Sequence, residues 1–340
     1  MTNRERFHLV FEGNNRVDRA PVLEWCSWWD KTVKFWEGEG LTAGMSGAQL
    51  FDHFGLDHNT QFWFEHRSHD RPETESEAEG GPMIRNEADY EKLRPYLFPK
   101  ISVERIMDDI NAVLPRYESG ENIVWYTLEG FFWFPRVLFG IENHLLSFYD
   151  QPKLYHRMCD ELADWHIETV NEFAKYIKPD AMTFAEDMSY NLGSMISKEL
   201  FDEFMLPYYK RVIPELKKHG TKILVDSDGD VSGLIPWFVE AGIEGIMPLE
   251  RQAGVDVAKL RAAHPKFMMM GGFDKMTMLQ GKPEIHREFE RLLPVIRSGR
   301  YIPNMDHQTP PGTTMENYRY YIEQLTEYAA QACKDCPAID

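Results

Sequence analysis

Short runs of β-branched and aromatic residues alternate with long runs of helical periodicity along this chain of 340 residues. This alternation constrains the fold more than any other feature, because it is typical of parallel strands joined by helices. About eight strands are predicted, the number that a closed barrel requires: Pro21–Trp25, Thr60–Glu65, Ile123–Leu128, Ala181–Ala185, Lys222–Val225, Glu244–Pro248, Phe267–Gly271 and Tyr301–Asn304. The sequence therefore predicts an α/β fold, a single (β/α)8 TIM barrel.

Long amphipathic segments lie between these strands and support the same architecture. Helices are predicted over Lys153–Tyr176, Lys198–His219, Val231–Ala241 and Pro283–Arg297, and glycines follow several of them as helix C-caps. An open doubly wound sheet is the alternative, but it would carry a glycine-rich phosphate turn after its first strand. The sequence there is Glu-Trp-Cys-Ser-Trp-Trp, which favours the barrel.

The chain is predicted to form one domain over residues 1–340, because it contains no repeat and no long linker. Residues 1–20 are predicted to be an N-terminal helical extension with its lead-in, and 331–340 a polar tail. The tail carries Cys333 and Cys336, a lone CxxC without the second ligand pair of a zinc knuckle. The acidic stretch Pro72–Gly81 is predicted to be a surface loop.

The charge balance excludes several kinds of partner. Lys and Arg number 37 against 55 Asp and Glu, a net charge of −18, which repels nucleic acid and anionic lipid. No apolar run approaches the roughly 20 residues of a membrane helix, and the N-terminus lacks the pattern of a secretion signal. We therefore expect a cytoplasmic protein that binds a small molecule, with its four cysteines as thiols.

Acidic residues gather where the predicted strands end, which is the active-site face of such a barrel. Glu129, Glu186 and Glu250 each follow a strand, and Asp226 and Asp228 follow the fifth. Side chains at i and i+2 of an extended segment point the same way, so both aspartates can face the barrel axis. His307 follows the eighth strand and Cys26 the first.

Two neighbouring carboxylates repel unless one holds a proton, a cation lies between them, or a donor such as His307 is shared. In the alternative reading, Asp226 and Asp228 accept main-chain hydrogen bonds in a turn around Gly229. Asp230 and Asp274 are predicted to be helix caps.

Aromatic residues in the loops near the strand ends are the second sequence feature that indicates a binding site. Trp28, Trp29, Phe131 and Trp133 lie in predicted loops and are expected to line the mouth of the barrel. Flat rings around carboxylates suit a planar small molecule with a reactive polar centre, or an onium methyl group.

Taken in order along nearly the whole chain, a set of short motifs resembles the uroporphyrinogen decarboxylase superfamily. The resemblance implies a single (β/α)8 barrel with a cleft at its C-terminal face. The motifs are Asn3–Phe7, Asn15–Val22, Glu186–Tyr190, Asp228–Asp230, Glu240–Gly245, Pro248–Glu250, Gly271–Lys275, Pro310–Pro311 and Glu316–Tyr318.

The superfamily contains decarboxylases of porphyrinogen acetate groups and methyltransferases that use a corrinoid protein. The decarboxylases carry an Arg-Gln-Ala-Gly-Arg run after the first strand, whereas Cys26–Asp30 contains no arginine. A substrate with eight carboxylates would meet repulsion of several kcal/mol in such an acidic cleft. The chain therefore resembles the corrinoid-dependent methyltransferase branch more closely than the true decarboxylases.

In that branch a His-x-Cys pair and a further Cys hold zinc, and the corresponding positions here are Asp226, Asp228 and His307. This harder ligand set would make Zn²⁺, Mn²⁺ or Fe²⁺ plausible. In the alternative, no metal is bound and the two aspartates act as general acid and base. The chain lacks the Asp-x-His-x-x-Gly motif of corrinoid domains, so methylcobalamin is expected on a separate corrinoid protein.

The main hypothesis is therefore a methyltransferase that moves a methyl group between a corrinoid protein and a small aromatic or onium compound. One alternative is a decarboxylase or other lyase acting on a smaller acid; another is a non-catalytic ligand-binding barrel. The predicted catalytic residues are Asp226, Asp228, His307 and Glu186, and the predicted substrate-binding residues are Glu129, Trp28, Trp29, Trp133, Cys26 and Glu250.

Overall fold

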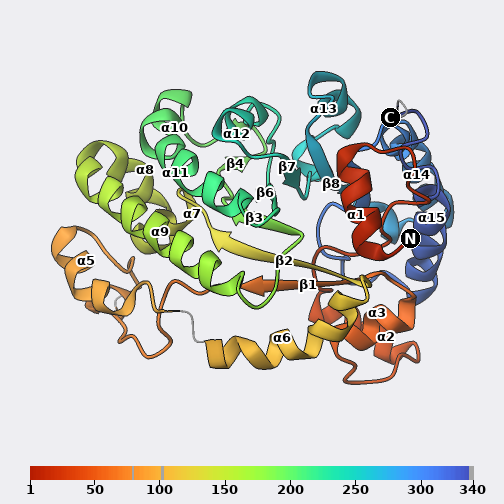
Figure 1. Ribbon diagram of the computed structural model, residues 1–340, viewed down its shortest axis with the longest axis horizontal. Coiled ribbons are helices and arrows are strands. Elements are labelled where there is room, and N and C mark those ends of the chain that lie inside the picture. The colour runs from red at the N-terminus through yellow and green to blue at the C-terminus, as the bar shows by residue number, and fades with distance from the viewer. Residues whose placement is uncertain (79, 101–102, 337–340) are drawn as a thin grey trace.

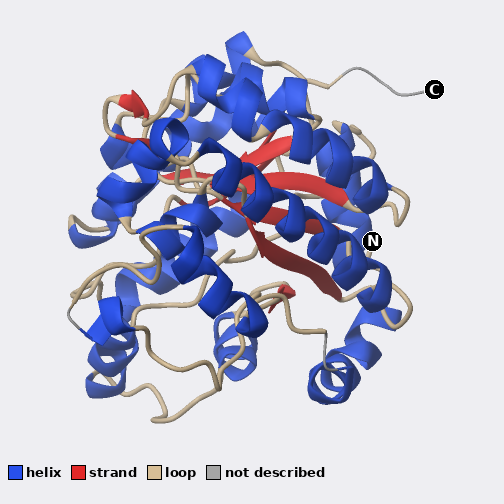
Figure 2. Ribbon diagram, turned by 90° about the vertical axis from the view of Figure 1, so that its left-hand side faces the viewer, coloured by secondary structure: helices blue, strands red, loops and turns tan. Residues whose placement is uncertain are grey.

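A curled sheet of parallel strands, surrounded by helices, forms the centre of the molecule (Figures 1 and 2). The computed structural model describes residues 1–78, 80–100 and 103–336. Seven strands pair in the order β1 (His58–Trp63), β2 (Asn122–Glu129), β3 (Ala181–Ala185), β6 (Lys222–Asp226), β7 (Gly245–Met247), β8 (Met268–Phe273) and β9 (Tyr301–Met305). The predicted (β/α)8 architecture is confirmed.

The predicted first strand, Pro21–Trp25, takes the eighth place in the barrel but forms no ladder. On one side, the carbonyl of Val22 accepts a hydrogen bond from the amide of Asp57, just before β1, at 2.7 Å. On the other, the Trp25 indole donates to the carbonyl of Met305 in β9 at 3.0 Å. A regular strand is prevented because the segment begins with a proline, which has no N–H, and because the Asp57 carboxylate takes the Val22 N–H at 2.8 Å.

Helices cover the outside of the sheet, and the predicted helix Lys198–His219 is in fact two. It breaks at Met205, because Pro207 lies in the first turn of the second helix, where a proline is tolerated. The helix predicted from Val231 begins only at Ile235.

The helices on the N-terminal side are α1 (Asn3–Glu12), α2 (Asp30–Gly38), α3 (Gly47–Phe54), α4 (Glu75–Ala78), α5 (Glu87–Leu93) and α6 (Val103–Glu118). Those in the middle of the chain are α7 (Trp133–Phe139), α8 (Ile141–Asp150), α9 (Pro152–Phe173), α10 (Lys198–Phe204) and α11 (Leu206–Lys217). The rest are α12 (Ile235–Ala241), α13 (Val257–Ala263), α14 (Lys282–Arg297) and α15 (Met315–Ala329), and β4 (Ser189–Tyr190) pairs with β5 (Gly193–Ser194). Helix α4 lies within the predicted surface loop Pro72–Gly81. Of the helices in the described part of the chain, none combines the length and the apolar character needed to span a membrane.

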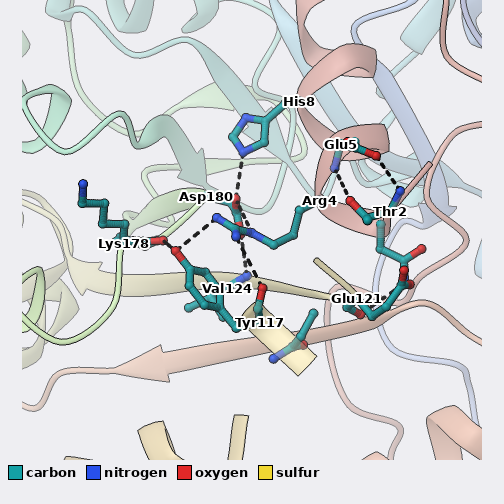
Figure 3. Close-up of polar contacts among 12 residues, drawn as sticks. Thr2, Arg4, Glu5, His8, Tyr117, Glu121, Val124, Lys178 and Asp180 are labelled. Atoms are coloured by element: carbon teal, nitrogen blue, oxygen red, sulfur yellow. Dashed lines mark hydrogen bonds and ion pairs between the residues drawn. The ribbon is translucent and has the colours of Figure 1, made fainter. Parts of the chain in front are cut away.

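Helix α1 closes the end of the barrel where the strands begin, and the arrows of β1 and β2 point away from it (Figure 1). The buried carboxylate of Asp180, just before β3, accepts hydrogen bonds from Arg4 Nε at 3.0 Å and from the Val124 amide at 3.0 Å. His8 Nε2 lies 2.7 Å from the same carboxylate (Figure 3). The predicted N-terminal helix is therefore attached to two neighbouring strands.

The end of the chain is not a free tail up to the last described residue. Ala332 and Cys333 are buried, and the amide of Cys333 donates to the carbonyl of Ile296 in α14 at 3.2 Å. The predicted polar tail thus packs against the end of α14 over residues 331–336. Residues 337–340 of that prediction lie outside the described residues.

Candidate active site

The strand register places two predicted site residues in one row at the mouth of the barrel. Glu129 pairs with Ala185, and Ala185 pairs with Asp226, so the three side chains share one face of the sheet. Two residues earlier on this face, the hydroxyl groups of Thr127 and Thr183 are hydrogen-bonded at 2.6 Å. With strands about 4.8 Å apart, Glu129 and Asp226 flank the opening at roughly 10 Å.

Asp226 and Asp228 lie in a cluster of acidic groups that raise one another's pKa values. Burial, together with the charges of Asp187 and Asp228, raises the pKa of Asp226 well above its usual range. Burial and the charges of Asp187 and Glu250 raise the pKa of Asp228 to about 7. Asp228 therefore exchanges its proton near neutral pH, and both pKa values are raised, as expected for carboxyl groups placed side by side in a buried site.

The turn after β6 does not consume these two carboxyl groups. The amide of Asp228 donates to Asp187 Oδ1 at 3.1 Å, and the amide of Gly229 donates to Glu250 Oε2 at 3.2 Å. Among the described hydrogen bonds, none runs from a main-chain amide to the carboxylate of Asp226 or Asp228. The alternative in which both aspartates serve only the turn around Gly229 is therefore wrong.

Asp187 is a member of the cluster to which sequence analysis assigned no role. It has a left-handed backbone, with φ of 40°, a conformation that non-glycine residues seldom adopt. The Arg136 guanidinium donates to its carbonyl at 2.8 Å, which holds the carboxylate toward the turn after β6. Its signal in the sequence was only its position directly after Glu186 at a strand end.

Lys275 is the second residue that sequence analysis missed. Its Nζ lies 3.3 Å from Glu250 Oε1 and 3.9 Å from Asp306 Oδ1, and its charge lowers the pKa of Asp228. A cluster of carboxylates needs a counter-charge, and Lys275 follows the strand β8 immediately after Asp274, so the residue could have been found. Asp274 itself accepts from the Met276 amide and is the predicted helix cap.

His307 lies at the mouth but does not join the two aspartates. Its ring packs edge-on against Trp25, with centroids 6.0 Å apart. Burial and the neighbouring Lys275 lower the pKa of His307, so the imidazole is neutral near pH 7. No described hydrogen bond or ion pair connects it to Asp226 or Asp228, and the predicted three-residue centre is therefore not assembled.

The predicted metal site does not fit the geometry. In the part of the chain that the structure describes, no three His, Cys, Asp or Glu side chains converge closely enough to hold a metal ion. His307 packs against Trp25, and no described contact joins it to Asp226 or Asp228. Burial and the charge of Glu24 raise the pKa of the adjacent Cys26 well above its usual range.

Glu186, predicted to be catalytic, anchors a loop instead. Its carboxylate accepts hydrogen bonds from the amides of Phe131 at 2.9 Å, Phe132 at 2.8 Å and Trp133 at 3.1 Å, and from the hydroxyl of Tyr209. These donors surround the start of α7, where a helix favours negative charge. Glu186 is fully buried and has no free oxygen for a substrate.

The predicted aromatic wall is only partly correct. Trp28 and Phe131 are buried, and the Trp28 ring packs against Trp36, Phe51 and Tyr318 in the core.

Trp29, in contrast, is 47% exposed at the start of α2. Trp133 is partly exposed, with the Arg136 guanidinium 4.9 Å from its ring. Exposed apolar side chains also follow other ends of the barrel strands, at Trp63, Tyr190, Leu192 and Met276. The mouth therefore has an apolar rim.

Glu129 borders a separate cavity beside the carboxylate cluster. The cavity has a volume of about 520 Å³ and lies between the loop after β1 and the end of β2. His66 Nδ1 and Arg67 Nη2 lie 3.4 and 3.7 Å from the Glu129 carboxylate. Burial raises the pKa of Glu129 to about 7, so this cavity also presents a carboxyl group that exchanges a proton near neutral pH.

Comparison with known proteins places the chain in a family. Residues 75–328 match the family described as Uroporphyrinogen decarboxylase (URO-D), and the chain belongs to this family. It is 26% identical over 266 residues to a uroporphyrinogen decarboxylase of Thermus thermophilus, a match that covers 74% of this chain and 73% of the relative. It is 25% identical over 269 residues to the uroporphyrinogen decarboxylase of Anaeromyxobacter sp. (strain Fw109-5), covering 74% and 72%.

A solved structure with the same fold is named as a methyltransferase rather than a decarboxylase. The methyltransferase from Methanosarcina mazei superimposes with a TM-score of 0.67 at 17% sequence identity, over 96% of this chain and 99% of that chain. The similarity establishes the shared barrel architecture over almost the whole length of both chains. The family contains enzymes, and the acidic mouth occupies the end of the barrel where enzymes of this fold carry their active sites.

Proposed function

We propose that this protein is a methyltransferase that takes the methyl group of a small aromatic methyl ether and passes it to a corrinoid carried by a separate protein. The observation that carries the proposal is the pair of carboxyl groups of Asp226 and Asp228, whose pKa values are both raised, at the end of the barrel strands. An ether oxygen becomes a far better leaving group when an acid delivers a proton to it.

In this reaction the bond between the methyl carbon and the ether oxygen breaks, and its electron pair stays on the oxygen. The proton of Asp228 goes to that oxygen, so the product is a phenol and Asp228 becomes a carboxylate. The corrinoid, when bound, supplies the electron pair that accepts the methyl group. An onium compound leaves as a neutral amine and needs no proton, so the ether is the substrate class that uses this acid.

In addition to burial, Asp187 and Lys275 adjust the proton affinity of Asp228. The negative charge of Asp187 favours the protonated form, whereas the ammonium group of Lys275 opposes it. The two effects place the pKa near the working pH, where a general acid is most effective. The exposed ring of Trp29 and the partly exposed ring of Trp133 supply flat apolar surface for an aromatic substrate.

The test is methyl transfer from methoxybenzene to free cob(I)alamin, followed by the absorbance change of the cobalamin. The rate is expected to fall as pH rises above about 7, because Asp228 loses its proton. Asp228→Asn is expected to lower the rate by about 100-fold, the usual contribution of a general acid. Asp230→Asn is the matched control, because Asp230 lies in the same loop and its carboxylate accepts from the Ser232 amide. Equal rates for D228N and the unchanged protein would contradict the assignment.

Decarboxylation of a small acid is the second candidate, supported by the decarboxylases among the relatives. Lys275 would bind the carboxylate, and Asp226 or Asp228 would give its proton to the carbon atom after CO₂ has left. Release of CO₂ from benzoate-type acids without any corrinoid, combined with no methyl transfer, would favour this reaction. Ligand binding that is unchanged in D228N, with neither reaction, would indicate a non-catalytic barrel.

A further inference from the structure

The CxxC motif near the end of the chain forms a tight turn in the structure. The amide of Cys336 donates to the carbonyl of Cys333 at 3.1 Å, the hydrogen bond of a β-turn. The first and fourth Cα atoms of such a turn lie less than about 7 Å apart, which is within the range that a disulfide bond spans. The backbone therefore brings the two cysteines close enough to be joined.

The two sulfur atoms share one space beside a glycine. A Cβ atom built on Gly299 would lie 2.6 Å from Cys336 Sγ and 3.0 Å from Cys333 Sγ. Gly299, at the end of α14, also has φ of 70°. Only glycine leaves this space free for both thiols.

The two thiols differ in accessibility. Cys333 is fully buried, whereas Cys336 is partly exposed and donates to the carbonyl of Ser298 at 3.2 Å. Burial and the neighbouring Cys336 raise the pKa of Cys333 to about 12. An oxidant therefore meets Cys336 first.

We propose that Cys333 and Cys336 are a dithiol site that a small organic disulfide oxidises to an intramolecular disulfide. The Cys336 thiolate attacks one sulfur of the oxidant and displaces its other half as a thiol. Cys333 then gives up its proton and displaces the second half. The protein loses two protons and two electrons, and the oxidant is reduced to two thiol molecules.

The site lies at the end of the barrel opposite the acidic mouth. It packs against the end of α1, since Asn15 Nδ2 donates to the carbonyl of Cys336 at 3.3 Å, and Gly299 contacts Gly13. Oxidation is therefore expected to change the packing of the C-terminal turn and to leave the chemistry at the mouth unchanged. The inference does not depend on the proposed function.

The experiment exposes the folded full-length protein to oxidised glutathione, followed by intact mass and peptide mapping. The unchanged protein is expected to lose about 2 Da, with a bond between Cys333 and Cys336, while Cys26 and Cys159 remain thiols. Cys333→Ala is expected to keep one glutathione on Cys336, a gain of about 305 Da. Cys336→Ala is expected to gain nothing, because Cys333 is buried.

A measurement without any substitution guards against misfolding of the variants. In the reduced protein, iodoacetamide is expected to alkylate Cys336 at least about 10-fold faster than Cys333, as follows from their difference in exposure. Three outcomes would overturn the proposal: a persistent glutathione adduct with no internal disulfide in the unchanged protein, trapping on Cys333 in C336A, or a disulfide that includes Cys26.

Discussion

Gly130 leaves the space that Glu186 occupies. A Cβ atom on Gly130 would lie 2.0 Å from the carboxyl carbon of Glu186, so Gly130→Ala must displace the carboxylate from the three amides it accepts. Separating a buried carboxyl group from its hydrogen bonds is among the most damaging changes to a protein. We expect G130A to lower the free energy of unfolding by about 3 kcal/mol in urea titration. Gly233→Ala is the control, because nothing lies within 4 Å of its Cβ position.

Asp228 should make stability depend on pH. Its pKa is raised from 3.8 to about 7 on folding, so the folded protein binds more protons than the unfolded chain between these two values. The stabilisation is complete below pH 3.8 and is lost as pH rises through 7. Since one pKa unit corresponds to about 1.4 kcal/mol, the loss is up to about 4 kcal/mol.

Asp228→Asn cannot titrate. The free energy of unfolding is measured by urea titration at about pH 4, 5, 6 and 7. The value for D228N should therefore rise relative to that of the unchanged protein as the pH increases. A constant difference across the series would show that Asp228 ionises at its ordinary pKa.

For individual residues, the sequence predicted the positions of the site side chains better than it predicted their roles. The i and i+2 spacing of Asp226 and Asp228 correctly placed both at the mouth. The role of Glu186 could not be predicted, because its partners are main-chain amides some 55 residues earlier in the chain. Nearly every residue has such an amide, so the sequence does not show which ones Glu186 binds. Trp28 is buried through contacts with α2, α3 and α15, which local sequence does not reveal.

Among the secondary-structure elements, α1 depends on one buried carboxylate. Asp180→Asn would leave Arg4 and His8 facing a neutral amide in place of a fully buried carboxylate. We expect a loss of about 3 kcal/mol in the free energy of unfolding, together with faster hydrogen exchange in α1.

Asp18→Asn removes an ion pair to Arg6 on the same helix, and its side chain is 45% exposed. It should cost less than about 1 kcal/mol, because exposed ion pairs contribute little. Similar losses in D180N and D18N would show that burial does not distinguish them.

Seven of the predicted strands exist as strands, because β-branched and aromatic periodicity reports burial directly. The failures arise where side chains replace the main-chain pattern. The segment Pro21–Trp25 forms no ladder because the Asp57 carboxylate accepts the hydrogen bond of the Val22 amide. This contact joins residues that are far apart along the chain. The helix break at Met205 was foreseeable from Pro207, since a proline is tolerated in the first turn of a helix but not in its interior.

The charge of the whole molecule opposes binding of polyanions. The chain carries a net charge of −18, and its mouth adds carboxyl groups with a single nearby ammonium group from Lys275 among the described ion pairs. Salt screens such repulsion over about 10 Å at 0.1 M. Binding of a porphyrin with eight carboxylates, followed by fluorescence, should therefore be weak and should strengthen as salt is added. A tetracationic porphyrin should show the opposite dependence, and the same sign for both would contradict this account.

The segment that stands in the eighth place of the barrel is held to β1 and β9 by individual contacts, whereas six continuous ladders join the seven strands to one another. Opening the barrel along this line would break no ladder of main-chain hydrogen bonds, so the barrel opens more easily here than between two paired strands. Trp25 and Cys26 sit on the same line. The main chain can therefore separate beside these two residues without breaking any of the six ladders.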